Sequence, residues 1–128
     1  MIVDFRDLKL NDEAPIYLQI IRYIKMGIVA GTFSSEDELP SRRILSARLK
    51  VNPNTVQKAY SYLEEERLLI SYPGAKSILT VTKEQRAQIR EELIHREALN
   101  YIRSAQQMGF SQSRAEQFIQ LLWEKAGE

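Results

Sequence analysis

Residues 39–63 read LPSRRILSARLKVNPNTVQKAYSYL, and this stretch decides the fold. It holds two short helical patterns joined by a tight turn, with basic or amide-bearing residues at the exposed positions. The stretch carries five Arg or Lys residues and no Asp or Glu, although the whole chain has a net charge of only +1. Such a surface is typical of proteins that approach the phosphate backbone of DNA. The stretch therefore predicts a DNA-binding helix-turn-helix.

Capping signals set the limits of these two helices. Ser41 can cap the first, which runs to about Lys50. Asn52 and Pro53 open the second in the favoured order of a cap residue followed by proline at the first helical position. The apolar positions expected to face inward are Ile44, Leu45 and Leu49 in the first helix and Val56, Ala59, Tyr60 and Leu63 in the second.

The sequence before this stretch predicts a further helix. Pro15 suits a helix start, and Gly31 suits its end. Between them, apolar residues recur at helical spacing, at Tyr17, Ile20, Ile21, Ile24 and Ile28. Residues 1–12 form an N-terminal arm or a short strand, and residues 32–38 are polar and loop-like.

The sequence after this stretch predicts a β-hairpin. Leu68–Tyr72 and Ser77–Thr82 both have strand-like composition, and Pro73-Gly74 between them is a turn signal. Three helices followed by a hairpin are typical of a winged helix-turn-helix, which we place at residues 1–82. The expected fold class is mainly α with a small β-hairpin wing.

Residues 83–128 predict two amphipathic helices. Thr82 can cap a long one that ends at Gly109, and Ser111 can cap another. Two such helices cannot fully bury their apolar sides against each other, so we expect a dimerisation segment that makes the protein a homodimer. The alternative is that the last helix folds back on the winged domain of its own chain. The residues expected at the dimer interface are Ile94, Tyr101, Ile102, Phe118, Ile119, Leu122 and Trp123.

Composition argues against several other classes of protein. The chain has no cysteine and a single histidine, which disfavours thiolate metal sites and Ser-His or Cys-His catalysis. Its five glycines form no phosphate-binding loop. No apolar run reaches membrane-spanning length, and the N-terminus does not resemble a signal peptide. We therefore expect a cytoplasmic protein that is not an enzyme, binds no cofactor and does not contact membranes.

Residues Ala14–Val81 resemble the DNA-binding domain of the GntR family of bacterial transcription regulators. The matching pieces are PIYLQI at 15–20, LPS at 39–41 and VNPNTV at 51–56. The NPNT form and the short C-terminal part are similar to the YtrA subfamily, whose members carry two C-terminal helices in place of a large effector-binding domain. The resemblance implies a repressor, with control of a nearby transporter operon.

The sequence departs from the family pattern at three places. Lys50 and Arg67 stand where the family often has glycine, and at Lys50 we expect the turn to force a residue with a side chain toward positive φ. The wing reads Pro73-Gly74-Ala75-Lys76, with fewer glycines than is usual. Wing contacts are therefore the least defined part of the predicted interface.

The first turns of the third helix carry the predicted base-reading residues Asn54, Thr55, Gln57 and Lys58. Asn and Gln can pair with adenine and Lys can reach guanine, while the free N–H groups of the first turn favour a phosphate. The other predicted DNA-binding residues are Ser41, Arg42, Arg43, Asn52, Gly74 and Lys76. By the resemblance, Arg43 is the arginine that touches DNA. Asn52 could instead serve only as a cap, and Arg42 could simply be solvated.

The leading functional hypothesis is a sequence-specific, homodimeric repressor that binds double-stranded DNA at an inverted-repeat operator. The alternative is a winged-helix adaptor that binds proteins without reading DNA, because a fold alone does not fix function. An adaptor has no need for an acid-free basic surface. Nothing in the sequence identifies a small-molecule effector.

Overall fold

The computed structural model describes residues 1–74 and 76–127, which form two compact units. The first unit spans Met1–Arg90, and the second begins at Glu91. The expected division after residue 82 coincides with the start of the long fourth helix, whose first two turns belong to the first unit. The fold class predicted from the sequence, mainly α with a small β wing, is confirmed.

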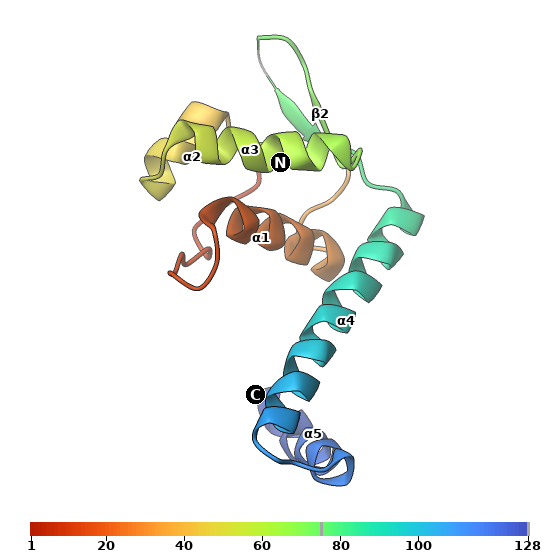
Figure 1. Ribbon diagram of the computed structural model, residues 1–128. Coiled ribbons are helices and arrows are strands. Elements are labelled where there is room, and N and C mark those ends of the chain that lie inside the picture. The colour runs from red at the N-terminus through yellow and green to blue at the C-terminus, as the bar shows by residue number, and fades with distance from the viewer. Residues whose placement is uncertain (75, 128) are drawn as a thin grey trace. The chain divides into compact units, whose positions relative to one another are not determined.

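Helix α1 spans Ile16–Ala30 and provides one side of the first unit's core (Figure 1). Pro15 occupies its N-cap position, and Gly31 ends it in the left-handed conformation with φ of 82°. The predicted periodicity is confirmed, because the four isoleucines Ile20, Ile21, Ile24 and Ile28 are all buried. Gly27 of this helix packs so closely against the buried Phe33 ring that a side chain at position 27 would overlap the ring.

Helices α2 and α3 form the helix-turn-helix, at Arg42–Leu49 and Pro53–Glu65. Both predicted caps are confirmed, since Ser41 Oγ accepts from the Ile44 amide and Asn52 Oδ1 accepts from the Asn54 amide. The predicted inner face of α3 is also confirmed: Val56, Ala59, Tyr60 and Leu63 are fully buried. It packs against α1 and α2.

One core prediction for α2 is wrong. Ile44 is 46% exposed, whereas Leu45 and Ser46 are buried. The helix presents Leu45 to the core, and Ile44 lies about 100° away around the helix axis. The buried Ser46 hydroxyl is satisfied by donating to the Arg43 carbonyl at 2.9 Å.

A three-stranded antiparallel sheet in the order β1-β3-β2 completes the first unit. Strands β2 (Leu69–Ser71) and β3 (Ser77–Leu79) form the predicted hairpin, although each is shorter than expected. Strand β1 (Glu38–Leu39) corrects the interpretation of residues 32–38 as a loop throughout, because Glu38 pairs with Ile78. In the N-terminal arm only Ile2 joins this sheet, through an isolated parallel bridge to Glu38.

Helix α4 spans Lys83–Gln107 and α5 spans Gln112–Ala126. Thr82 and Gln85 form a reciprocal capping box, in which Thr82 Oγ1 accepts from the Gln85 amide and Gln85 Oε1 accepts from the Thr82 amide. The first turns of α4 are attached to α1 by a hydrogen bond in which Arg86 Nε donates to the Ile28 carbonyl at 3.1 Å. Within the described residues, no helix is both long enough and apolar enough to span a bilayer.

Candidate DNA-binding surface

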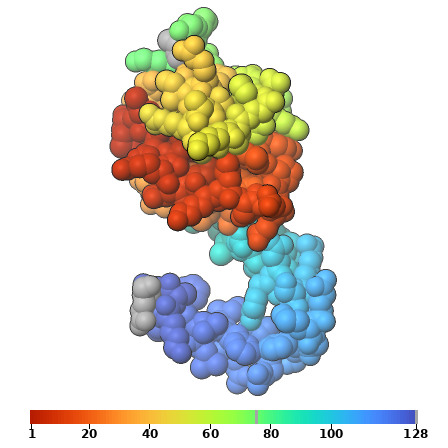
Figure 2. All heavy atoms as spheres, turned by 90° about the vertical axis from the view of Figure 1, so that its left-hand side faces the viewer, coloured from red at the N-terminus to blue at the C-terminus, as the bar shows by residue number. Residues whose placement is uncertain are grey.

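Helices α2 and α3 and the hairpin wing gather at one end of the first unit (Figure 2). The turn between the two helices depends on Lys50, which adopts φ 57° and ψ 48° and donates its amide to the Ser46 carbonyl. The expected positive φ is confirmed at Lys50, and the structure shows a positive φ of 61° at Arg67 as well. At positions 50 and 67 the chain therefore makes a left-handed turn with a basic residue in place of glycine.

The first turn of α3 does not offer free N–H groups to a phosphate, contrary to our expectation. Pro53 has no N–H. The Asn54 amide donates to Asn52 Oδ1 at 2.8 Å, and the Thr55 amide donates to the Asn52 carbonyl at 2.9 Å. Asn52 thus uses its side chain as the helix cap, and the backbone amides of Asn54 and Thr55 are already occupied.

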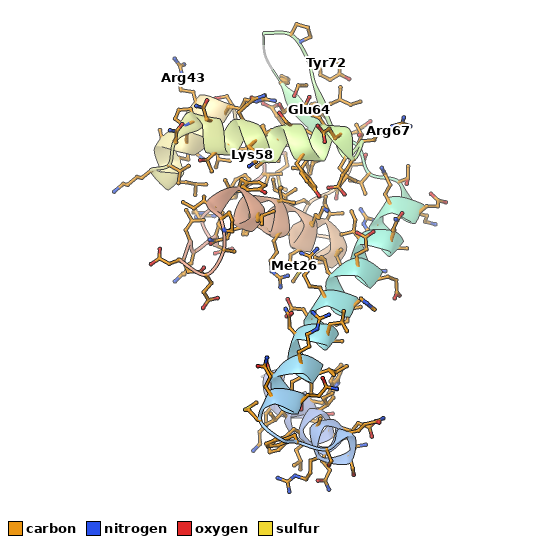
Figure 3. All side chains as sticks on the ribbon, viewed as in Figure 1. Met26, Arg43, Lys58, Glu64, Arg67 and Tyr72 are labelled. Atoms are coloured by element: carbon orange, nitrogen blue, oxygen red, sulfur yellow. The ribbon has the colours of Figure 1, made fainter. Side chains whose placement is uncertain are left out.

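Three of the four predicted base-reading side chains of α3 are exposed, and Thr55 is half-buried. Asn54 presents its side-chain amide at the N-terminal end of the helix. The Gln57 amide donates to Ser61 Oγ at 3.0 Å on the same helix. The Lys58 ammonium lies 4.1 Å from the centroid of the Tyr17 ring, on the side of α3 that faces α1 (Figure 3).

Arg43 is the predicted DNA-binding residue whose charge is most available. Its side chain is exposed and points away from the unit (Figure 3). Among the described residues, no partner holds its guanidinium. Ser41 beside it has its hydroxyl engaged as the α2 cap, accepting from the Ile44 amide at 3.1 Å.

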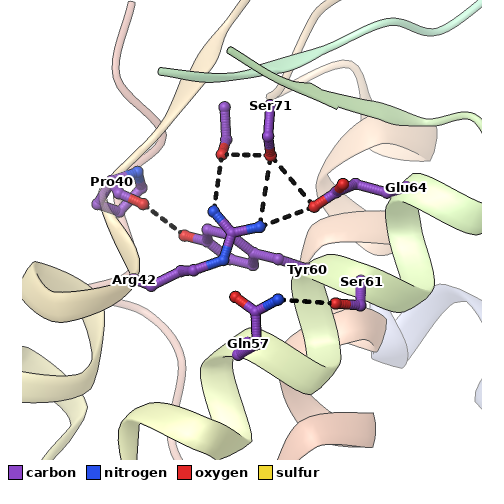
Figure 4. A network of polar contacts seen from close by, with 8 residues as sticks. Pro40, Arg42, Gln57, Tyr60, Ser61, Glu64 and Ser71 are labelled. Atoms are coloured by element: carbon purple, nitrogen blue, oxygen red, sulfur yellow. Dashed lines mark hydrogen bonds and ion pairs between the residues drawn. The ribbon is translucent and has the colours of Figure 1, made fainter. Parts of the chain in front are cut away.

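Arg42 differs from its neighbour because its guanidinium points into the protein (Figure 4). Nη2 donates to Glu64 Oε1 at 2.7 Å, and the guanidinium also lies 3.4 Å from the hydroxyls of Ser71 and Ser77. Its carbon is 5.0 Å from the centroid of the Tyr60 ring. The charge of Arg42 is therefore directed at Glu64 rather than at solvent.

Tyr60 anchors α3 beneath this guanidinium. Its hydroxyl donates to the Pro40 carbonyl at 2.6 Å, just before the start of α2. Burial raises the pKa of Tyr60, with a smaller opposing effect from Arg42, so the phenol stays neutral and remains a donor. The hydrogen bond fixes the spacing between α3 and the segment that leads into α2.

The acidic residues at the end of α3 are largely neutralised. Glu64 pairs with Arg42, and Glu66 forms an ion pair with Lys25 of α1, with 2.9 Å between Glu66 Oε1 and Lys25 Nζ. Only Glu65 among the three is exposed without a recorded partner in the described part of the chain. This pairing keeps two negative charges from opposing an approaching phosphate.

The wing carries the remaining predicted contacts. Gly74 adopts φ 79° at the turn, and the Tyr72 amide closes the hairpin by donating to the Lys76 carbonyl. The Lys76 side chain is 61% exposed and only loosely paired with Glu38, at 3.8 Å. Ala75, which the sequence analysis includes in the wing, lies outside the described residues.

Two tyrosines, Tyr17 and Tyr72, lie beside the predicted DNA-binding residues without being among them. Tyr17 holds the Lys58 ammonium over its ring, and Tyr72 is 55% exposed on the wing. Tyr72 could have been found from strand alternation, since it follows the inward-facing Ser71. Tyr17 carried no such signal, because its helical spacing had assigned it to the core.

Five of the predicted dimerisation residues line a single apolar groove in the second unit. The groove has a volume of about 480 Å³ and runs between α4 and α5. These five residues are Tyr101, Phe118, Ile119, Leu122 and Trp123. Ile102 lines a neighbouring cavity of about 440 Å³, and Ile94 lies outside both while being 60% exposed. The structure thus leaves large side chains, including Trp123 at 73% exposure, without cover within the described chain.

These features define a winged helix-turn-helix protein with a basic surface, followed by a short helical unit. Residues 16–76 match the family described as bacterial regulatory proteins, gntR family. The chain is 35% identical over 89 residues to the HTH-type transcriptional repressor YtrA of Bacillus subtilis, covering 65% of this chain and 68% of YtrA. The chain belongs to the GntR family, and the resemblance to YtrA is confirmed.

Other relatives agree with this assignment. An uncharacterised HTH-type transcriptional regulator of Bacillus subtilis, YhcF, is 27% identical over 82% of this chain and 87% of its own. Among solved structures, a GntR family transcriptional regulator from Listeria monocytogenes is similar with a TM-score of 0.76 and 32% identity, covering 87% of this chain and 97% of its own. YtrA from Sulfolobus acidocaldarius matches with a TM-score of 0.55 and 30% identity, covering 74% of this chain and 99% of its own. The chain is therefore a transcriptional regulator with a DNA-binding domain.

Proposed function

We propose that this regulator acts as a homodimeric repressor that reads an inverted-repeat DNA operator. The observation that carries the proposal is the basic, acid-free surface of α2 and the N-terminal part of α3, where Arg43 projects without an intramolecular partner. The repressor role is supported by the similarity to YtrA of Bacillus subtilis, a transcriptional repressor.

In this proposal α3 enters the major groove and its side chains read bases. Asn54 and Gln57 carry the amides that suit adenine, and Lys58 supplies a charge for guanine or phosphate. The Gln57–Ser61 hydrogen bond and the Tyr17 ring beside Lys58 hold both side chains before DNA arrives, which lowers the entropy lost on binding. Thr55 and Asn52 contribute chiefly to the start of the helix.

Arg43 and Lys76 serve the flanks of the recognition helix. Arg43 projects from the first turn of α2 toward the DNA, where its fork of donors suits a guanine edge or a phosphate. Lys76 with Gly74 lies on the wing, in a position to reach a neighbouring phosphate or the adjacent minor groove. Because the wing has a single basic side chain, we expect its contribution to be smaller than that of the helix-turn-helix.

The dimer forms through the apolar groove between α4 and α5 of each chain. A second copy is the occupant we propose, because the groove is lined almost entirely by large apolar side chains, and such a surface exposed to water favours association. Two-fold symmetry then presents two α3 helices to successive major grooves, which requires an inverted repeat.

Replacing Arg43 with alanine tests the DNA-binding surface. We expect the variant to lose about 1–3 kcal/mol of binding free energy and to relax sequence preference at one position of each half-site if Arg43 contacts a base. A loss that is uniform across DNA sequences and lowers the salt slope by about one unit for each Arg43 in the dimer would assign it to a phosphate.

Arg6→Ala is the matched control, because it removes an exposed arginine whose charge is already paired with Asp4 at 2.6 Å. Both variants are titrated with the same operator duplex and with a scrambled duplex by fluorescence anisotropy. If Arg43→Ala binds the operator as tightly as Arg6→Ala does, then α2 does not contact DNA as proposed.

A further inference from the structure

We infer that Arg42 is a positioning residue that fixes the wing against the recognition helix and does not itself contact DNA. This inference rests on the proposed function and deepens it, because it removes one basic residue from the predicted interface. It follows from the contacts of one guanidinium with three separate elements, α3, β2 and β3.

Arg42 lies on the first turn of α2, Glu64 on the last turn of α3, and Ser71 and Ser77 face each other across the hairpin. The Ser71 hydroxyl donates to Glu64 Oε1 at 3.1 Å and lies 3.0 Å from the Ser77 hydroxyl. The four side chains form one network that joins the base of the wing to both helices of the helix-turn-helix (Figure 4).

A guanidinium bonded to a carboxylate at 2.7 Å has most of its positive field cancelled at the distance of a DNA phosphate. The Nε of Arg42 is shielded from solvent and is without a partner among the described residues, while the side chain as a whole is 30% exposed. Turning this side chain out to DNA would leave Glu64 unpaired beside the hydroxyls of the wing. A phosphate contact by Arg42 would therefore have to break the network first.

Strands β2 and β3 have only three residues each and β1 pairs with only two residues of β3, so few sheet hydrogen bonds fix the direction of the hairpin beyond Ser71 and Ser77. The hydrogen bonds of Arg42 to Ser71 and Ser77 attach the hairpin at the strand residues next to the turn that carries Gly74 and Lys76. Arg42 therefore sets the orientation of the wing, and with it the direction from which Lys76 approaches DNA.

The Glu64→Ala variant separates the two roles of Arg42 by the direction of its effect. If Arg42 positions the wing, losing Glu64 misplaces it, and operator binding becomes weaker. If Arg42 is instead a DNA contact restrained by Glu64, the same change frees the guanidinium and binding becomes tighter. Glu65→Ala is the matched control, because it removes an equal charge from the adjacent, exposed position.

The double variant Arg42→Ala/Glu64→Ala keeps the net charge of the protein unchanged. We expect it to bind the operator roughly tenfold more weakly than the parent protein, because the wing contact is lost. We also expect Lys76→Ala to weaken binding in the parent background and to have almost no further effect in the double variant. Additive effects of the two changes would overturn the inference.

Two further measurements protect the test against simple misfolding. Ser71→Ala removes a single hydroxyl from the network and should shift affinity in the same direction by a smaller factor. Circular dichroism and thermal unfolding establish that each variant is folded at the temperature of the binding assay. A variant series that is folded and binds the operator normally would contradict the positioning role.

A measurement on the free protein keeps this inference separate from the proposed function. The chain has no cysteine, so spin labels can be placed uniquely at Arg48→Cys on α2 and Tyr72→Cys on the wing. The distance distribution between the labels should be narrow in the parent and clearly broader with Arg42→Ala/Glu64→Ala. Failure of the parent protein to bind any DNA would defeat the proposed function, whereas an unchanged distance distribution would defeat the role of Arg42.

Discussion

Lys50 places the left-handed turn of the helix-turn-helix on a residue that has a side chain. A residue other than glycine in this conformation costs about 1 kcal/mol, because its Cβ approaches the following carbonyl oxygen. The family pattern, which often has glycine here, predicts a positive φ at this position, and the structure gives a φ of 57°. In exchange for this strain, Lys50 places a positive charge beside the recognition helix α3.

Lys50→Gly tests that account at the level of a single residue. We expect the variant to raise the free energy of unfolding by roughly 0.5–1 kcal/mol, since glycine adopts positive φ without the steric cost. Chemical denaturation followed by circular dichroism measures the change. The control is Lys50→Ala, which removes the same charge but keeps a Cβ. Equal stability of the two variants would mean that the turn is not strained.

Individual side chains were predicted well where their role is local. The capping roles of Ser41 and Asn52 depend on neighbours two or three residues away, so the sequence contains the whole signal. The inward turn of Arg42 depends on Glu64, Ser71 and Ser77, which are 22 to 35 residues distant in sequence. Since no local pattern encodes those contacts, the sequence analysis could only place Arg42 among the exposed basic residues.

At the scale of elements, α1 depends on a glycine in its interior. A Cβ built at Gly27 would lie 2.1 Å from the Phe33 ring, and the Phe33 amide donates to the Gly27 carbonyl at 3.0 Å. Glycine inside a helix normally destabilises it by up to 1 kcal/mol relative to alanine. Here that cost permits the chain after α1 to fold closely back across the helix.

Gly27→Ala should therefore destabilise the first unit, although alanine is the better helix former. We expect a loss of about 1–3 kcal/mol from displacement of the buried Phe33 ring, which exceeds the gain in helix propensity. Thermal unfolding monitored by circular dichroism measures the loss. Ala30→Gly, in the last turn of the same helix, is the comparison for propensity alone. An increase in stability on Gly27→Ala would show that the contact with Phe33 is not rigid.

The helices were predictable because their caps and periodicity lie within each segment. Strand β1 was not, since its two residues are recognisable only by their pairing with Ile78 and Ser77 in β3. The exposed Ile44 shows a second reason for failure. An eight-residue helix has room for few inward positions, and composition alone does not select among adjacent apolar residues.

At the scale of the whole molecule, the proposal depends on a dimer formed by the second unit. The helix α5 has no buried residue, and its apolar side chains line the groove with α4. The exposure of these side chains agrees with the predicted interface, although the interface itself stays a prediction. Periodicity identified the apolar face of α5, but no single-chain pattern can specify how a partner packs on it.

Leu122→Glu/Trp123→Glu should convert the dimer into monomers. Buried carboxylates at the centre of an apolar interface carry a desolvation cost that exceeds the gain from association. Light scattering coupled to size-exclusion chromatography gives the mass directly. Leu121→Glu is the matched control, because Leu121 is 67% exposed on the same helix but does not line the groove. A double variant that keeps the dimer mass would contradict the proposed interface.

The central claim is that this chain reads DNA as a dimer, and selection from random duplex DNA tests it most directly. The parent protein is used to select bound duplexes from the random pool. Its affinity for the enriched duplexes is then measured at increasing salt concentration. We predict an inverted repeat whose half-sites are about one helical turn apart. We also predict a slope of log K against log salt concentration on the order of −5 to −9. Weak binding without any enriched sequence would contradict the claim and would favour a winged-helix adaptor that recognises protein.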